Sequence, residues 1–181
     1  MKCSVYIATS ADGFIAKPDG DIEWLHRSEY EDAAQVGLDY TEFISTVDAI
    51  VMGRHSFEKV LTFDDWYYED IEVIVLTTRK LTVPERLGDK VRVESGTPHE
   101  IVTTLSGEGK NHLYIDGGIT IQRFLKAKLI DELTITVLPI LLGNGIPLFG
   151  NEGIEQSLKL IEVSSSPGGT IQKRYRVKST E

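Results

Sequence analysis

Two stretches of this 181-residue chain follow one plan, in which a run typical of a buried strand ends at glycine and a helix follows. They are residues 49–58 (AIVMGRHSFE) and residues 112–125 (HLYIDGGITIQRFL). Glycine at such a junction lets a ligand approach the backbone closely, and the first N–H groups of the following helix have no partner inside it. Such groups bind anions. The pattern therefore predicts a ligand with several phosphates, and a nucleotide cofactor is the leading candidate.

The rest of the chain alternates strands with helices in the same way. The patterns predict strands at 5–9, 49–52, 73–77, 113–115 and 132–138, and helices at 30–45, 56–61, 97–105 and 119–127. Strands separated by helices need crossover connections, which give a largely parallel sheet. Residues 158–163 and 171–178 flank a turn rich in Ser, Pro and Gly, which predicts a hairpin. We expect an α/β fold with a mixed, mostly parallel central sheet, helices on both faces and a C-terminal antiparallel hairpin.

Length and charge limit the classes of protein to which this chain can belong. A single domain over residues 1–181 suits the length. The net charge of −9 argues against an extended surface for nucleic acid or for an anionic membrane. The start of the chain has no long apolar segment, and no run is long enough to cross a membrane, so we expect a cytoplasmic protein.

The metal-binding and disulfide-forming residues are few and scattered. Cys3 is the only cysteine, which excludes an internal disulfide and a cysteine cluster for zinc. The four histidines lie far apart in the sequence. We therefore predict no metal site, and we interpret the pair Asp64 and Asp65 as part of a solvated turn.

Basic and hydroxyl side chains stand near the first glycine turn and after the next strand. Arg54, His55 and Ser56 follow Gly53, and Ser56 can either cap the helix or bind a phosphate oxygen. The second group follows the strand at 73–77 and comprises Thr77, Thr78 and Arg79. Arg54 and Arg79 together could bind a 2′-phosphate, which would favour NADP over NAD. An ordinary strand-to-helix turn and an ordinary basic turn are the alternative interpretations of these two groups.

The second glycine turn carries a carboxylate at the end of its strand. Asp116 precedes Gly117 and Gly118, and open α/β sheets place ligands at the carboxyl ends of their strands. Asp116 is a candidate for binding substrate, or it is a helix-capping residue. The chain lacks the Gly-x-Gly-x-x-Gly fingerprint, so a nicotinamide cofactor would have to bind by another scheme.

A glycine-containing loop follows the first predicted strand and precedes Trp24. It begins near Ala8 and contains Ser10, Asp12 and Ile15. Such a loop could cover a cofactor, with Ile15 and Trp24 shielding hydride transfer from water. A surface loop with one packed aromatic side chain is the alternative.

Taken in order, these segments resemble the dihydrofolate-reductase-like fold. The likeness is closest to the reductase domain of the riboflavin-biosynthesis deaminase–reductase and to its stand-alone relatives. It spans nearly the whole chain and is carried by residues 10–16 (SADGFIA), 48–54 (DAIVMGR), 115–118 (IDGG), 131–133 (DEL) and 139–149 (PILLGNGIPLF).

The resemblance implies NADPH as cofactor, hydride transfer to a heterocyclic substrate, and a homodimer. The substrate class it implies is 5-amino-6-(5-phosphoribosylamino)uracil or a related heterocycle. Asp116 takes the place of the acidic residue that contacts substrate and is the implied catalytic residue, with Ser10, Asp12 and Trp24 near the substrate. The implied cofactor-binding residues are Ala8, Ile15, Gly53, Arg54, His55, Ser56, Thr77, Thr78, Arg79, Gly117, Gly118, Ile119, Thr120 and Ile121.

Two departures from the family pattern bear on the substrate. The acidic residue that assists pterin protonation in dihydrofolate reductases falls on Gly37 here, which argues against folate reduction. After the second helix, the riboflavin reductases usually have two acids, Pro and then a basic residue, whereas residues 64–68 read DDWYY. Dihydrofolate or pterin reduction and a non-catalytic NADP(H)-binding module are the alternative functions.

Overall fold

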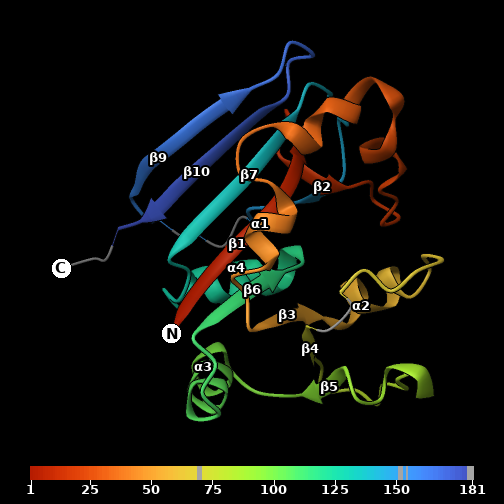
Figure 1. Cartoon of the computed structure of the whole chain (residues 1–181), viewed down its shortest axis with the longest axis vertical. Coiled ribbons are helices and arrows are strands. Elements are labelled where there is room, and N and C mark those ends of the chain that lie inside the picture. The colour runs from red at the N-terminus through yellow and green to blue at the C-terminus, as the bar shows by residue number, and fades with distance from the viewer. Residues whose placement is uncertain (69–70, 151–152, 154, 179–181) are drawn as a thin grey trace.

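The computed structural model describes residues 1–68, 71–150, 153 and 155–178. These residues form an eight-stranded sheet in the order β5-β4-β3-β6-β1-β7-β10-β9 (Figure 1). The strands from β5 to β7 run parallel, and β10 is antiparallel to both β7 and β9. The strands are β1 (Lys2–Ser10), β3 (Ala49–Gly53), β4 (Glu72–Leu76), β5 (Val91–Glu94), β6 (His112–Asp116), β7 (Glu132–Leu138), β9 (Leu158–Ser165) and β10 (Ile171–Val177). The expected mixed sheet and terminal hairpin are both confirmed.

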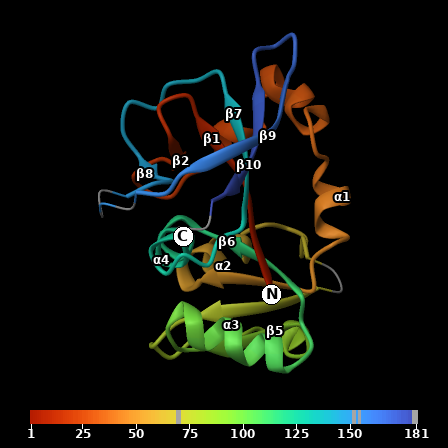
Figure 2. The ribbon, with the colours of Figure 1, turned by 90° about the vertical axis from the view of Figure 1, so that its left-hand side faces the viewer.

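Helices cover both faces of this sheet because its central strands are apolar on both sides. In β3, Ile50 and Met52 pack beneath α1 (Tyr40–Ile44) and α2 (Arg54–Val60). Ala49 and Val51 face the opposite core, to which α3 (Pro98–Gly107) and α4 (Gly118–Lys126) contribute. Figure 2 shows α1 and α4 on opposite sides of the sheet. This alternation along a strand is what a parallel sheet buried on both faces requires.

A smaller sheet and several short helices complete the described part. Strand β2 (Phe14–Ala16) pairs antiparallel with β8 (Ile146–Pro147). The 3₁₀ helices are η1 (Glu23–His26), η2 (Ser28–Gln35) and η3 (Glu85–Leu87). None of the helices in the described ranges is long and apolar enough to cross a membrane.

The single helix predicted over residues 30–45 is wrong. The chain forms η2 and then α1, and Gly37 between them has a φ of +71°. A Cβ atom at this position would collide with the side chain of Gln172, and the N–H of Leu38 donates to Gln172 Oε1 at 2.7 Å. The carboxylate of Asp39 then caps α1 by accepting from Thr41 N at 2.7 Å. A contact with β10, distant in sequence, overrides the local helical pattern here.

Local sequence signals correctly predicted the start of α3. Thr97 and Glu100 form the two reciprocal hydrogen bonds of a capping box, and α3 begins at Pro98 as predicted. Strand β5 was not predicted. It is only four residues long and two of its residues, Arg92 and Glu94, are charged, so it has no continuous apolar run.

Candidate functional site

The two glycine turns lie side by side at the carboxyl edge of the sheet. Strands β3 and β6 are neighbours, with Met52 paired to Asp116. A Cβ atom at Gly53 would lie 3.1 Å from Thr120 Oγ1, and one at Gly117 would collide with Ser56 Oγ. Each glycine therefore lies against a hydroxyl residue of the other turn. Four of the predicted cofactor-binding residues therefore pack together, namely Gly53, Ser56, Gly117 and Thr120.

Gly117 has a backbone conformation that only glycine adopts readily. Its φ is +84° and its ψ is 136°. Gly118 is buried beneath the small sheet, where a Cβ atom would lie 2.9 Å from Ile15 Cδ1 and 3.4 Å from Pro147 O. The structure thus places Ile15, from β2, directly over the start of α4.

The basic side chains at this edge differ in the hydrogen bonds and ion pairs that they form. Arg54 Nε donates to Glu58 Oε1 at 2.6 Å, and the Nδ1 atom of the exposed His55 lies 3.6 Å from the same carboxylate. Arg79 is exposed, and its guanidinium has no ion pair within the described part of the chain. The N–H of Arg79 donates to Thr77 Oγ1 at 3.1 Å, which fixes the turn after β4. Arg79 is therefore the freer of the two candidates for an anionic ligand.

Thr78, Ile119, Thr120 and Ile121 occupy very different environments. Thr78 is exposed, and Ile119 is 68% exposed at the first turn of α4. Thr120 is buried against Gly53, whereas Ile121 is fully buried in the core and its N–H donates to Gly117 O at 2.9 Å. Both the side chain and the N–H of Ile121 are thus used inside the protein, which gives this residue a packing role.

Asp116 lies at the end of β6 among tyrosine side chains. The hydroxyl of Tyr114 donates to Tyr6 O at 2.8 Å and approaches Asp116 Oδ1 at 3.4 Å. Burial raises the pKa of Asp116 above its ordinary value of 3.8, and hydrogen bonds from the Gly117 N–H and the Tyr114 hydroxyl act in the opposite direction. This carboxyl group can therefore hold a proton more readily than an exposed aspartate.

The negative charge of Asp116 acts on the pKa of three tyrosines. Burial, followed by the negative charge of Asp116, raises the pKa of Tyr40, Tyr68 and Tyr114. These residues come from α1, from the segment before β4 and from β6, so sequence patterns did not bring them together. The one available signal was Tyr114, which lies two residues before Asp116 and hence on the same face of the strand.

Ser10 and Asp12 connect two loops. Ser10 Oγ donates to Asp12 Oδ1 at 2.6 Å and accepts from Phe14 N at 2.9 Å. The Asp12 carboxylate also accepts from Leu142 N at 3.1 Å and from Gly143 N at 2.8 Å. The contacts of both side chains fix the loop after β1 to the loop after β7. A role of Ser10 and Asp12 in substrate binding stays a prediction.

Trp24 and Ala8 lie together beside the same loops. Trp24 is 1% exposed and clusters with Tyr30 and Leu138, and Ala8 packs against this cluster. Its indole N–H has no hydrogen-bond partner among the described residues. The role of Trp24 near the substrate and that of Ala8 at the cofactor stay predictions.

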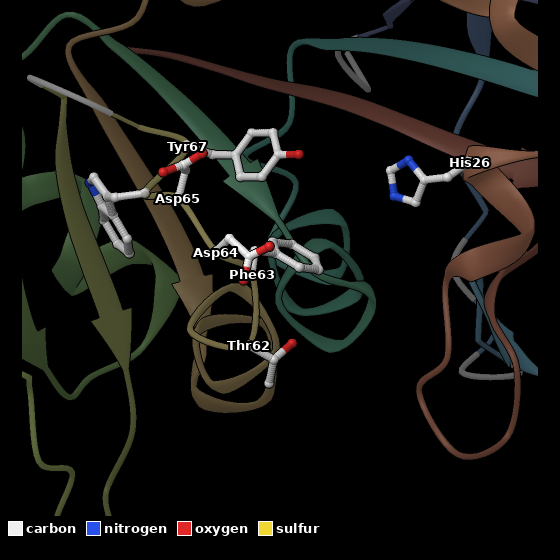
Figure 3. A pocket seen from close by; sticks show the side chains of 7 residues that line it. His26, Thr62, Phe63, Asp64, Asp65 and Tyr67 are labelled. Carbon is white, nitrogen blue, oxygen red and sulfur yellow. The ribbon is translucent and has the colours of Figure 1, made fainter.

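A cleft of about 600 Å³ opens between η1 and the segment that follows α2. Figure 3 shows His26 on one side and the side chains of residues 62–65 and Tyr67 on the other. Asp64 and Asp65 both line this cleft and are exposed. Within the described ranges, no group of three or more His, Cys, Asp or Glu residues could hold a metal ion.

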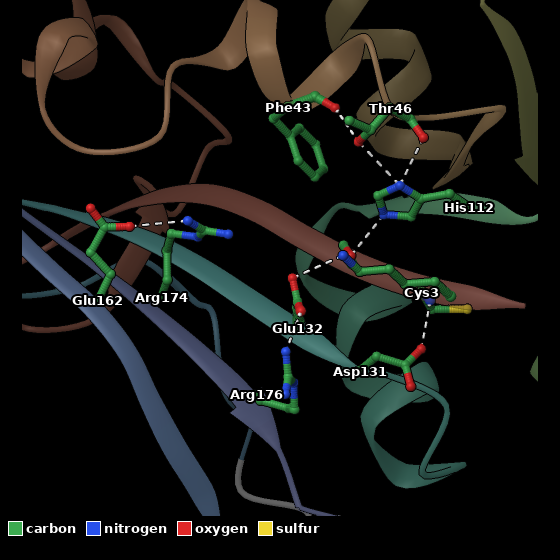
Figure 4. A network of polar contacts seen from close by, with 11 residues as sticks. Cys3, Phe43, Thr46, His112, Asp131, Glu132, Glu162, Arg174 and Arg176 are labelled. Carbon is green, nitrogen blue, oxygen red and sulfur yellow. Dashed lines mark hydrogen bonds and ion pairs between the residues drawn. The ribbon is translucent and has the colours of Figure 1, made fainter.

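A separate polar network lies at the amino ends of the strands, away from these loops (Figure 4). His112 Nδ1 lies 2.9 Å from Thr46 O, and its Nε2 lies 2.8 Å from Ser4 Oγ. Because a carbonyl only accepts, Nδ1 carries the proton and Nε2 accepts from the Ser4 hydroxyl. Burial lowers the pKa of His112. This histidine joins β6 to β1 and has a structural role.

The comparisons with known proteins identify a family and two relatives that align over nearly the whole chain. The family model of the RibD C-terminal domain matches residues 2–171. The uncharacterized protein YwjB of Bacillus subtilis (strain 168) is 36% identical over 177 residues, which cover 96% of this chain and 97% of YwjB. The uncharacterized protein YyaP of the same organism is 23% identical over 178 residues, or 93% of this chain and 91% of YyaP.

Two solved structures are also similar to this chain. A protein from Shewanella sp. PV-4, provisionally assigned to riboflavin biosynthesis, superposes with a TM-score of 0.88 at 40% identity over 99% of this chain and 100% of its own. A diaminohydroxyphosphoribosylaminopyrimidine deaminase/5-amino-6-(5-phosphoribosylamino)uracil reductase from Thermotoga maritima superposes with a TM-score of 0.71 at 15% identity. That match covers 98% of this chain and 56% of the Thermotoga chain, and it shows a shared fold.

Proposed function

This chain belongs to the RibD C-terminal domain family, and from that membership we propose that it is an NADPH-dependent reductase of the riboflavin-biosynthesis type. Its substrate would be a small heterocycle of the 5-amino-6-(5-phosphoribosylamino)uracil class. One observation carries the proposal beyond family membership. Asp116, a carboxyl group with a raised pKa, directly precedes the interlocked glycine turns and lies among three tyrosines.

The residues present fit a dinucleotide cofactor. Neither Gly53 nor Gly117 has a Cβ atom, and each lies against a hydroxyl residue of the other turn, so two stretches of backbone are close together. The residues that would hold the cofactor are the loop near Ala8 and Ile15, the turn from Gly53 to Ser56, residues 77–79, and the first turn of α4. When bound, NADPH supplies the hydride. Arg79 would bind its 2′-phosphate, because this guanidinium has no competing ion pair among the described residues.

The side chains of this protein would orient the substrate and exclude water. With its raised pKa, Asp116 could donate a hydrogen bond to a ring nitrogen or oxygen in its protonated form and accept one in its ionised form. The Tyr114 hydroxyl, on the same strand, lies 3.4 Å from this carboxylate. The buried Trp24 and the overlying Ile15 would keep water from the cofactor side.

A steady-state assay tests this proposal. NADPH oxidation is followed with 5-amino-6-(5-phosphoribosylamino)uracil and with related pyrimidines and pterins. We expect turnover with a pyrimidine, and loss of turnover but retention of NADPH binding in Asp116→Asn. Absence of NADPH binding by calorimetry at millimolar concentration would overturn the proposal.

Dihydrofolate serves as the comparison substrate. The position of the pterin-protonating acid falls on Gly37, which lies in the break before α1. The nearby Asp39 carboxylate is used to cap α1. We therefore expect turnover of dihydrofolate to be lower by at least about 100-fold, the usual contribution of a general acid.

We also propose that the protein forms a homodimer through β9. This strand is the last of the sheet, and its large apolar side chains are exposed, namely Leu158 (39%), Leu160 (51%), Ile161 (41%) and Val163 (56%). Antiparallel pairing with β9 of a second copy, about an axis between Leu160 and Ile161, would place Lys159 opposite Glu162. Such pairing would satisfy the free edge of the sheet and match opposite charges.

A further inference from the structure

Two side chains of the sheet hold the turn that precedes α1. Gln172 of β10 is buried, and its Oε1 accepts from Leu38 N at 2.7 Å, while its Nε2 donates to Leu38 O at 3.1 Å and to Thr136 Oγ1 at 3.3 Å. The hydroxyl of Tyr6 in β1 donates to the same Leu38 O at 2.8 Å. We call Gln172 and Tyr6 the Leu38 clamp, because together they bind both backbone groups of Leu38.

A series of contacts joins this clamp to Asp116. The Tyr6 ring packs edge-to-face on Tyr40 at 5.5 Å between centroids and stacks on Phe43 at 4.9 Å. Phe43 packs edge-to-face on Tyr114 at 5.2 Å, and the Tyr114 hydroxyl lies 3.4 Å from Asp116 Oδ1. Figure 1 shows α1, which carries Tyr40 and Phe43, in front of β1. The clamp and the carboxyl group therefore belong to one packed cluster.

The turn held by the clamp sets the position of Tyr40. Gly37 has a φ of +71°, Leu38 follows it, and Tyr40 is the first residue of α1. Glycine has wide conformational freedom, so the clamp rather than the local sequence fixes this turn. The charge of Asp116 acts on the pKa of Tyr40, which is consistent with their closeness. Release of Leu38 would therefore let the start of α1 shift and admit water beside Asp116.

The titratable groups whose pKa responds to Asp116, in the described part of the chain, are tyrosines from three elements. They are Tyr40 of α1, Tyr68 before β4 and Tyr114 of β6. The largest effect on the pKa of Asp116 itself is burial, and among the described residues no Lys, Arg or His charge contributes to it. The burial of Asp116 is thus the property that the clamp can change.

We infer that Gln172 is a positioning residue for the substrate side of the Asp116 site, and that it acts through Leu38 and Tyr40. The inference rests on the proposed function, in which Asp116 meets the substrate. With the turn already ordered, substrate binding does not have to supply the free energy of ordering it. The glycine turns that would hold NADPH precede α2 and α4, so the clamp should affect the heterocycle and not the cofactor.

Two variants release the clamp, and a third is the matched control. Gln172→Leu removes every hydrogen bond of this side chain and keeps a similar size. Tyr6→Phe removes only the hydroxyl and keeps the ring on α1. Gln156→Leu makes the same replacement at a glutamine whose Nε2 donates to Leu125 O in α4, away from the clamp.

Three measurements are made on each variant. KM and kcat are obtained with 5-amino-6-(5-phosphoribosylamino)uracil, and the Kd for NADPH by calorimetry. The pKa of Asp116 is obtained by NMR titration of carboxyl-labelled aspartate, with the signal assigned by Asp116→Asn.

Gln172→Leu should raise KM about tenfold, the value of about one hydrogen bond, and leave the Kd for NADPH unchanged. The pKa of Asp116 should fall toward its ordinary value of 3.8, because water would reach the carboxyl group. Tyr6→Phe should show both effects to a smaller extent. Gln156→Leu should show neither, since it leaves Leu38 bound.

An Asp116 pKa equal to that of the wild type in both clamp variants would overturn the inference. A Kd for NADPH that rises together with KM would also overturn it, because a general loosening of the fold predicts that result. If Gln172→Leu does not fold, Tyr6→Phe decides alone. If the wild-type protein reduces no heterocycle, the reductase proposal fails, and the NMR titration by itself supports or overturns the role of Gln172.

Discussion

The hydroxyl of Tyr114 lies 3.4 Å from the carboxylate of Asp116, on the same face of β6. The same hydroxyl donates to Tyr6 O at 2.8 Å, so it is held by β1, the neighbouring strand. Asp116 is consequently positioned by the sheet rather than by a flexible loop. This arrangement keeps a partly buried acid in place without a salt bridge to any described residue, at the cost of some stability.

Replacing Asp116 with Asn should increase stability and decrease activity. The raised folded-state pKa means that the contribution of Asp116 to stability is complete below pH 3.8 and is lost as the pH rises through the folded-state value. Asn does not titrate, so its advantage should grow with pH. We expect Tm to rise by about 2 to 4 °C near pH 8 and by less near pH 4, with kcat/KM reduced about 100-fold. Calorimetric scans at the two pH values check this, and an equal Tm difference at both would contradict it.

Gly117→Ala should destabilise the protein through two separable effects. The φ of +84° costs a residue with a side chain about 1 to 3 kcal/mol, and the new Cβ atom would also collide with Ser56 Oγ. Gly109→Ala is the matched control, since Gly109 has a φ of +89° and open space around its Cβ position. Urea denaturation should show a larger loss for Gly117→Ala, and Ser56→Ala should remove the difference. If the two alanine variants were equally stable, the collision would be absent.

Arg79→Ala should reduce the preference for NADPH over NADH by about 10- to 100-fold, the value of one charge-assisted hydrogen-bonding group. Arg54→Ala should have a smaller effect, because Glu58 already accepts from its Nε atom at 2.6 Å. Replacing both arginines should abolish the preference. Lys80→Ala removes the adjacent exposed cation and serves as the control. Dissociation constants for both cofactors give the ratio, and an unchanged ratio in the double variant would refute the assignment.

The stability of the protein should fall as the pH decreases below 6.5 because of His112. Burial lowers the folded-state pKa of this histidine, so the unfolded chain takes up a proton first. The stabilising contribution is complete above pH 6.5 and is lost on descent toward the folded-state pKa. Protonation of Nε2 would also end its acceptance from Ser4. Urea denaturation between about pH 7.5 and pH 5.5 should show this slope in the wild type and a flatter one in His112→Gln.

Leu160→Lys should convert the proposed dimer into a monomer. A charge at a position that is 51% exposed on an edge strand opposes strand addition and leaves the folded monomer intact. Val93→Lys makes the same change on β5, the opposite edge of the sheet, and should leave the dimer unchanged. Light scattering during size-exclusion chromatography measures both. A wild-type protein that is monomeric at all concentrations would remove the basis for this proposal.

Patterns within one strand or helix predicted most of the fold. Strand β7 has the predicted limits, and α3 begins at its capping box, because alternation and capping are local properties. The break at Gly37 could not be predicted in this way. It depends on Gln172, which is 134 residues from Leu38 in sequence and donates and accepts hydrogen bonds there.

The candidate site likewise has parts that a local sequence motif predicts and parts that only the folded chain brings together. The glycine turns were predicted because each is a contiguous motif, and the sheet then places them together. The tyrosines around Asp116 come from three separate elements, so only the folded chain reveals them. Asp12 was identified as a loop residue, but its partners at positions 142 and 143 are 130 or more residues away in the sequence.

The place of β1 between β6 and β7 has a consequence for synthesis on the ribosome. The first strand to be translated is central, and its two neighbours start only at His112 and Glu132. A nascent chain that has not yet reached β6 exposes both edges of β1. The contact between the Gly37 turn and Gln172 forms later still, because Gln172 lies in β10. The sheet around β1 can therefore close only after most of the chain has been synthesised.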